Sequence, residues 1–330
     1  MKLAKRPFGK TGIEVSELVF GGGAVGGILI DADDDTKRQV IDKAMDAGIN
    51  WIDTASSYGN GRSEEALGWL LREIEEDPYI STKFSIDTNK LTDLSGQIEA
   101  SLTASLKRLQ RDSVTLLQLH NPIGAETRGR LLGETQILRS GGILDSLERL
   151  REQGLISHFG ITALGEIASV LKVIGSGRIA SAQVYYNLLN PSAGLQLPQS
   201  WPAYDFSGIL QACDEQGVAA MNIRVFSAGV IATDDRTGKE QPLTPGDTVE
   251  SETEKAHKLF SVLGDKHGTR AQTAIRFALA EPRLACVVFG LAEIRHLDEA
   301  VAGAVRGALS QDALDEIEWR AGRRFRNWRR

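Results

Sequence analysis

The 330-residue chain is poor in the residues that build metal sites and disulfide frameworks, with two cysteines and five histidines. Cys213 and Cys286 form no C-x-x-C pair, which argues against a stapled secreted domain and indicates buried, reduced thiols. The histidines show no H-E-x-x-H spacing, so no metal site is expected. No apolar run reaches the roughly 18 residues that span a bilayer, and the first residues lack the apolar core of a signal peptide. We therefore expect a soluble cytoplasmic protein without a metal.

The charge of the chain is acidic, with a formal net charge of −6 at pH 7. Nucleic-acid binders carry a basic footprint, so such a partner is not expected, and nor is a membrane. Six arginines lie between Trp319 and Arg330. The favoured interpretation of this segment is pairing with the protein's own carboxylates or solvation, and contact with a phosphate or substrate stays open.

Short β-branched runs alternate with stretches of helical periodicity along the whole chain. Helical apolar spacing ends near Gly48 and Gly154, where a left-handed C-cap is expected. Buried parallel strands alternating with helices predict an α/β fold, a single (β/α)8 TIM barrel formed by residues 1–330. The predicted strands are Leu18–Phe20, Ile49–Asp53, Tyr79–Thr82, Val114–Leu119, Ile156–Ile161, Ile179–Tyr185, Val218–Ile223 and Ala285–Phe289.

Three features outside the strands refine this prediction. The glycine run Gly21–Gly27 lacks G-x-G-x-x-G spacing and precedes no helical pattern, which weakens a two-domain dinucleotide-binding alternative. Arg6–Glu17 predicts a β-hairpin that plugs the bottom of the barrel. Asn121–Gly142, Asn187–Ser207 and Thr233–Ser251 are too long for plain connections and follow strand C-termini, where barrel enzymes build active sites.

Four polar side chains near the ends of three consecutive predicted strands carry the strongest chemical signal. Asp53 ends a strand and Tyr58 follows in a glycine-rich loop, while Lys83 and His120 follow the next two strands. A buried aspartate needs a nearby cation, an ammonium stabilises a phenolate, and a histidine can donate to a carbonyl oxygen. Each residue alone is compatible with a surface or turn role, but together they predict a general acid with an oxyanion site. Ser63 is predicted to cap the helix that follows.

The chain resembles the aldo-keto reductase superfamily along almost its whole length. The matching stretches are Phe8–Gly12 with Val15–Ser16, Asp53–Gly68, Ser81–Lys83, Leu119–Pro122, Gly160–Ile161 and Gln183–Leu188. The aspartate, tyrosine, lysine and histidine of the superfamily's catalytic tetrad fall on the four residues named above. The resemblance implies a barrel that binds an extended nicotinamide cofactor across its top without a Rossmann fold.

The resemblance also implies where the cofactor lies. Where members usually have a Ser-Asn pair that holds the carboxamide, this chain has Thr162 and Ala163, of which only the threonine can donate. Gln183 keeps the usual amide, and Ile223 stands in place of an aromatic residue that often stacks on the nicotinamide. The expected cofactor-binding residues are Gly22, Gly23, Asp53, Thr162, Gln183, Ile223, Phe226, Ser227, Gly229, Gly290 and Arg295.

The choice between the two nicotinamide cofactors depends on the segment after the last strand. The resemblance places Arg224–Gly229 over the pyrophosphate and Gly290–His296 around the adenosine phosphate. Leu291–Glu293 offers no hydroxyl or basic side chain and carries an acid that repels phosphate, whereas Arg295 and His296 follow closely. With NADP(H) the commoner cofactor in the superfamily, we expect a slight preference for NADP(H), and NAD(H) stays an alternative.

The expected activity is NAD(P)H-dependent reduction of an aldehyde or ketone to an alcohol, with Tyr58 as general acid. The alternatives are a sugar dehydrogenase working in the oxidative direction and a redox-sensing regulatory subunit with the same fold. The partner is a small carbonyl or sugar substrate. Trp201, Tyr204, Phe226 and Trp328 are candidates either to line its pocket or to anchor loops and core.

Overall fold

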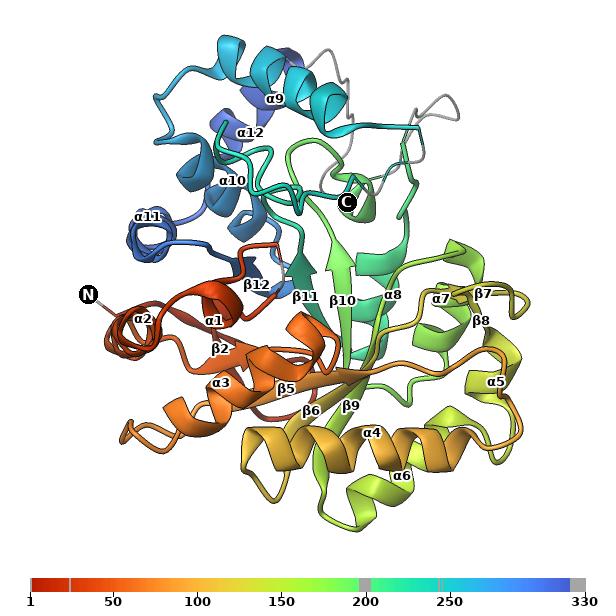
Figure 1. The fold of residues 1–330 in the computed structure, drawn as a ribbon. Coiled ribbons are helices and arrows are strands. Elements are labelled where there is room, and N and C mark those ends of the chain that lie inside the picture. Colours follow the sequence, from red (N-terminus) through yellow and green to blue (C-terminus); the bar gives the residue numbers. More distant parts are fainter. Residues whose placement is uncertain (1, 24, 196–202, 243, 245, 321–330) are drawn as a thin grey trace.

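The architecture is a closed barrel of parallel strands surrounded by helices (Figure 1). The computed structural model describes residues 2–23, 25–195, 203–242, 244 and 246–320. Within these residues eight strands close in the order β10-β11-β12-β3-β4-β5-β6-β9, which confirms the predicted barrel. The strands are β3 (Leu18–Gly21), β4 (Trp51–Asp53), β5 (Tyr79–Phe84), β6 (Val114–Leu119), β9 (Ile156–Thr162), β10 (Ser181–Tyr185), β11 (Ala219–Ile223) and β12 (Leu284–Gly290).

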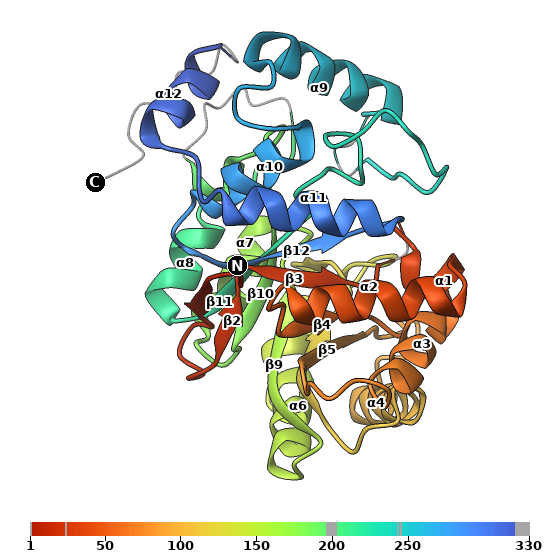
Figure 2. The same ribbon diagram turned by 90° about the vertical axis from the view of Figure 1, so that its left-hand side faces the viewer.

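Helices cover the outside of the barrel (Figure 2). The first long one is capped by Asp33, whose carboxylate accepts from the Thr36 amide, and it is followed by Gly48 at φ 89°. Gly154 has φ 76° after its helix, so both predicted left-handed glycines are confirmed. The helices are α1 (Ile28–Asp31), α2 (Asp34–Asp46), α3 (Arg62–Leu70), α4 (Leu94–Leu109), α5 (Glu134–Leu138), α6 (Ile143–Glu152), α7 (Ile167–Gly175), α8 (Ile209–Gln216), α9 (Val249–Leu263), α10 (Arg270–Leu279), α11 (Ile294–Val305) and α12 (Gln311–Arg320), with 3₁₀ turns η1 (Tyr58–Gly61) and η2 (Ser192–Gly194).

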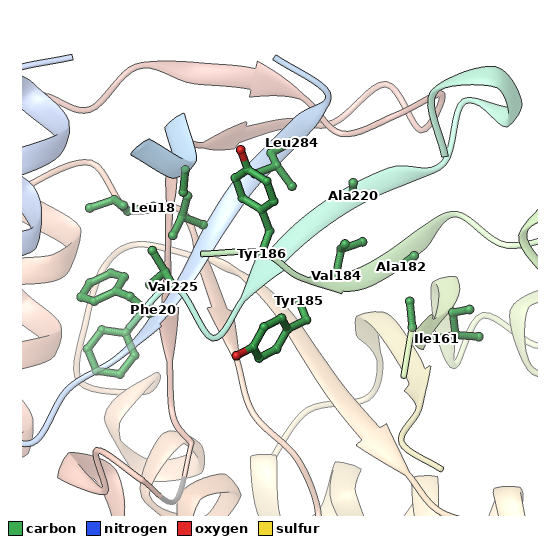
Figure 3. Packing of buried hydrophobic residues seen from close by; sticks show 14 of the residues in the cluster. Leu18, Phe20, Ile161, Ala182, Val184, Tyr185, Tyr186, Ala220, Val225 and Leu284 are labelled. Atoms are coloured by element: carbon green, nitrogen blue, oxygen red, sulfur yellow. The ribbon is translucent and has the colours of Figure 1, made fainter. Parts of the chain in front are cut away.

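The hydrophobic core has two parts. The larger part fills the space between strands and helices, and Figure 3 shows side chains of β3, β9, β10, β11 and β12 packed within it. The smaller part lies inside the barrel and includes Phe8, Val15 and Trp51. Phe8 belongs to the N-terminal hairpin of β1 (Lys5–Pro7) and β2 (Glu14–Ser16), and its ring centroid lies 4.6 Å from that of Trp51. The hairpin therefore closes the barrel from below, as expected.

Two local expectations were wrong. Helix α1 follows the glycine run, where no helix was expected, because its single turn is too short to show a periodicity in the sequence. Ser63 does not cap α3, since Gly61 occupies the N-cap position. The Ser63 hydroxyl instead donates to the Gly22 carbonyl at 3.0 Å and lies 2.8 Å from Thr54 Oγ1. Ser63 thus ties the loop after β3 to the loop after β4.

The three long segments contain short structure of their own. The first holds β7 (Ile123–Gly124), β8 (Leu132–Gly133) and α5, and the second holds η2. In the third, the Lys239 ammonium pairs with the Asp31 carboxylate of α1. This segment therefore reaches from the end of β11 to the element that follows β3. No helix in the described part of the chain is long and apolar enough to cross a bilayer.

Candidate active site

The strand register places the predicted catalytic residues at one end of the barrel. Asp53 pairs in register with Ser81 across β4 and β5, and Lys83 pairs with Gln118 across β5 and β6. His120 follows β6 directly, and its backbone amide donates to the Phe84 carbonyl at 2.8 Å. Tyr58 is in η1, where Gly59 and Asn60 have left-handed backbone conformations that kink the chain. The carboxyl ends of neighbouring parallel strands thus bring residues from three strands to one mouth.

Lys83 is the centre of this group. Its side chain is 0% exposed, and its Nζ donates to Asp53 Oδ2 at 2.6 Å and to the Thr54 carbonyl at 2.8 Å. The same Nζ lies 3.4 Å from the Tyr58 hydroxyl. Burial works to lower the pKa of the Lys83 ammonium, but the Asp53 carboxylate and the Tyr58 oxygen favour the charged form, outweigh burial and raise the pKa above its ordinary value. Lys83 therefore stays a cation beside the phenol.

His120 lies next to Tyr58. The two ring centroids are 5.9 Å apart and nearly perpendicular, at 83°. Burial, the Lys83 ammonium and the Arg130 guanidinium together lower the pKa of His120 to about 3. The imidazole is therefore neutral near pH 7 and can donate one hydrogen bond without bringing a charge.

The second oxygen of the Asp53 carboxylate has its own partners. Ser81 Oγ donates to Oδ1 at 2.6 Å, and Gln183 Nε2 donates to the same oxygen at 2.9 Å. Gln183 was expected to bind the cofactor; in this geometry its amide oxygen and its second N–H are the groups left for that purpose. Ser81 was not expected at the site. Its position two residues before Lys83 on one strand, and so on the same face, is the signal that identifies it.

Thr162 and the glycines after β3 fit a bound nicotinamide. Thr162 Oγ1 is buried and has no hydrogen-bond partner among the described residues, so it is available to a ligand's amide. A Cβ on Gly22 would lie 2.6 Å from Ser63 Oγ, so only glycine fits there. Gly23 has no side chain between it and the Tyr58 ring, which a Cβ would approach to 3.9 Å. The unpartnered Thr162 hydroxyl is the group among these that is suited to hold a cofactor carboxamide.

The loop after β11 has an unusual backbone. Ser227 has φ 46°, and Arg224, Ala228 and Gly229 also have positive φ. The Ser227 hydroxyl donates to the buried Glu252 carboxylate of α9 at 2.6 Å, so its proton already has an acceptor within the protein. Burial raises the pKa of Glu252 above its ordinary value. Strained non-glycine residues of this kind are held only where the surrounding structure over-determines them.

The other predicted cofactor residues are less enclosed. Ile223 and Phe226 are half-buried, and Gly290 is exposed at the end of β12. Arg295 is also exposed and forms a bidentate pair with Glu293, with nitrogen–oxygen distances of 2.7 and 3.1 Å. Its guanidinium also lies 3.6 Å from the Asp235 carboxylate.

The candidate pocket aromatics are only partly placed. Tyr204 is 41% exposed, and its ring centroid lies 5.8 Å from that of Phe206. Phe226 packs against the main core. Trp201 and Trp328 lie outside the described residues, as do five of the six arginines near the end of the chain.

Relatives of this chain include proteins of three kinds. It is 28% identical to chloroplastic pyridoxal reductase of Arabidopsis thaliana, over 94% of this chain and 84% of that protein. It is 24% identical to L-galactose dehydrogenase of the same plant, over 96% and 94%. It is also 24% identical to a probable voltage-gated potassium channel subunit beta of Oryza sativa subsp. japonica, over 94% of each.

The fold is shared with a solved reductase. The aldo-keto reductase AKR11C1 from Bacillus halodurans, in its holo form, superposes with a TM-score of 0.73 at 21% identity, covering 96% of both chains. The sequence model of the aldo/keto reductase family matches residues 17–319, a range that includes every barrel strand and all four residues at the mouth. The chain therefore belongs to the aldo/keto reductase family of oxidoreductases.

Proposed function

We propose that this protein reduces aldehyde or ketone carbonyls to alcohols with a nicotinamide cofactor and that Tyr58 is the proton donor. The observation that carries the proposal is the buried Lys83 ammonium, which lies between the Asp53 carboxylate and the Tyr58 hydroxyl. A cation held at this point stabilises the phenolate that remains after proton donation.

In this mechanism the protein's own groups orient and protonate the carbonyl. When bound, a reduced nicotinamide would supply the hydride that the carbonyl carbon accepts. The Tyr58 O–H donates its proton to the carbonyl oxygen, and the resulting phenolate is balanced by Lys83. His120, neutral near pH 7, donates a hydrogen bond to the same oxygen and selects the orientation of the carbonyl. Asp53 holds the ammonium in place.

The residues that would hold the cofactor are Thr162 and Gln183 at the carboxamide and the loop after β11 at the pyrophosphate. NADP(H) is the proposed cofactor, with Arg295 reading the 2′-phosphate. Its present partners Glu293 and Asp235 are both exposed, and exposed ion pairs contribute little, so a phosphate dianion can replace these carboxylates. NAD(H) is the alternative cofactor if the ion pair between Glu293 and Arg295 persists when the cofactor is bound.

The test is a panel of aldehydes, ketones and aldoses, followed by nicotinamide absorbance with both cofactors and in both directions. Efficient aldehyde reduction supports the proposal, whereas turnover confined to aldose oxidation supports the dehydrogenase alternative. Cofactor binding without turnover of any substrate would favour a regulatory subunit and overturn the proposal.

The matching variant is Tyr58→Phe, which keeps the ring but removes the proton. We expect normal folding and cofactor binding with a loss of turnover of about 10²–10⁴-fold, the usual contribution of general acid catalysis. Retention of more than about a tenth of the activity would remove Tyr58 from the role of acid.

A further inference from the structure

Two further buried side chains of the barrel interior, Trp51 and Ser81, are hydrogen-bonded to the site described above. The indole Nε1 of Trp51 donates to Ser81 Oγ at 3.0 Å, and Ser81 Oγ donates to Asp53 Oδ1 at 2.6 Å. Trp51 and Ser81 are both 0% exposed. These two contacts continue through the carboxylate to Lys83 and so to the Tyr58 hydroxyl. A line of hydrogen bonds therefore runs from the barrel interior to the proposed proton donor.

The sheet geometry makes this line a fixed one. Trp51 and Asp53 are two residues apart on β4, and Ser81 and Lys83 are two residues apart on β5. All four side chains therefore point to the interior face of the barrel. The Trp51 ring packs against two aromatic neighbours. Its ring centroid lies 4.6 Å from that of Phe8 and 5.4 Å from that of Tyr79. Its N–H direction is thus set by packing that begins at the N-terminal hairpin.

The indole of Trp51 determines which group donates and which accepts in this series of hydrogen bonds. Indole nitrogen only donates, so Ser81 must accept from Trp51, and the single hydroxyl proton is left for Asp53. Ser81 then holds Oδ1, together with Gln183, and turns Oδ2 towards Lys83. Without the hydroxyl, one of the two donors that fix the rotation of the carboxylate is lost.

We propose that Ser81, oriented by Trp51, is a positioning residue for proton transfer, acting through Asp53 and Lys83 on Tyr58. The inference rests on the proposed function, because it concerns the same proton. Its consequence is that the stability of the Tyr58 phenolate depends on a serine that touches neither substrate nor cofactor. The contact between Lys83 and Tyr58 is already long, at 3.4 Å, so a small rotation of Asp53 weakens it.

The test compares Ser81→Ala with Ser181→Ala. Ser181 is a matched control: it is also 0% exposed, lies on barrel strand β10 and accepts from a buried side chain, Gln118, at 3.2 Å. We would measure alcohol oxidation with saturating cofactor from pH 6 to 10, with cofactor affinity and thermal unfolding alongside. A hydrogen bond to a charged group corresponds to about a tenfold effect or more, so Ser81→Ala should lower kcat by about tenfold. In the plot of alcohol-oxidation rate against pH, the midpoint of the rising limb should move up by about half a pH unit to one pH unit.

Further variants keep the inference falsifiable if Ser81→Ala folds poorly. Ser81→Thr retains the hydroxyl and should restore the wild-type pH profile. Trp51→Phe keeps an aromatic ring but removes the indole donor, and should shift the midpoint in the same direction by less. An unchanged midpoint in Ser81→Ala or Trp51→Phe, or an equal shift in Ser181→Ala, would overturn the inference. If the wild type itself turns over no carbonyl or alcohol, the proposed function fails instead, and that outcome is visible before any variant is compared.

Discussion

Replacing Lys83 with methionine removes the cation on which the site depends while keeping most of its apolar volume. Both partners of the ion pair are buried, with the Lys83 and Asp53 side chains 0% and 4% exposed. After the substitution Asp53 keeps the Ser81 and Gln183 hydrogen bonds but has no cation at 2.6 Å. The Thr54 carbonyl also loses a donor. An uncompensated buried charge is therefore the main cost.

Removing one partner of a buried ion pair costs about 3–5 kcal/mol, a large part of the roughly 5–15 kcal/mol that stabilises a folded domain. We expect Lys83→Met to fold with reduced stability and to lose nearly all turnover. The pH dependence follows from the raised pKa of Lys83. A cation with a raised folded-state pKa contributes stability that is complete below its unfolded value, 10.5, and is lost as pH rises through the folded value. Lys83→Met should lack this loss of stability at alkaline pH.

The assay is urea unfolding of wild type, Lys83→Met, Asp53→Asn and the double variant. The double variant should be clearly more stable than the sum of the single losses predicts, because it leaves no unpaired charge. Lys172→Met is the control, since Lys172 pairs with Glu134 at 2.5 Å but is 60% exposed, and its loss should cost about 0–1 kcal/mol. Additivity within about 0.5 kcal/mol would refute the reasoning, as would equal losses for the two lysines.

Two further predictions concern His120 and Arg295. Because the pKa of His120 is lowered to about 3 from 6.5, its neutral form contributes stability that is present above pH 6.5 and is lost as pH falls towards 3. His120→Gln should therefore gain in Tm relative to wild type between pH 6.5 and 4, and a difference independent of pH would contradict this assignment. Arg295→Ala should weaken NADPH binding by about 5- to 150-fold and leave NADH binding nearly unchanged. Titration of both cofactors checks this. Glu293→Ala is the control with the opposite expected effect, because it frees Arg295 to bind the phosphate. Equal losses for both cofactors would remove Arg295 from the site.

The barrel and the position of its mouth were determined by local sequence patterns. A strand buried on both faces is mostly apolar, and two of the helices end just before a left-handed glycine, so the alternation is visible along the sequence. Because all parallel strands point the same way, polar residues at strand ends meet at one rim. For this reason the sequence alone predicts that Asp53, Lys83 and His120 are neighbours.

Only the tertiary structure decided how these residues are paired. Ser81 lies 28 positions from Asp53 and Gln183 lies 130 positions away, yet both donate to the same carboxylate oxygen. Which of several interior polar groups meet depends on strand register and on how large side chains such as Trp51 fill the barrel, and neither is expressed in local spacing. Ser63 shows the same limit, because its sequence context is typical of a helix cap while its hydroxyl joins two loops. Periodicity and strand polarity act locally and so appear in the sequence, whereas hydrogen-bond partners across a closed barrel are chosen by the packing of the whole chain.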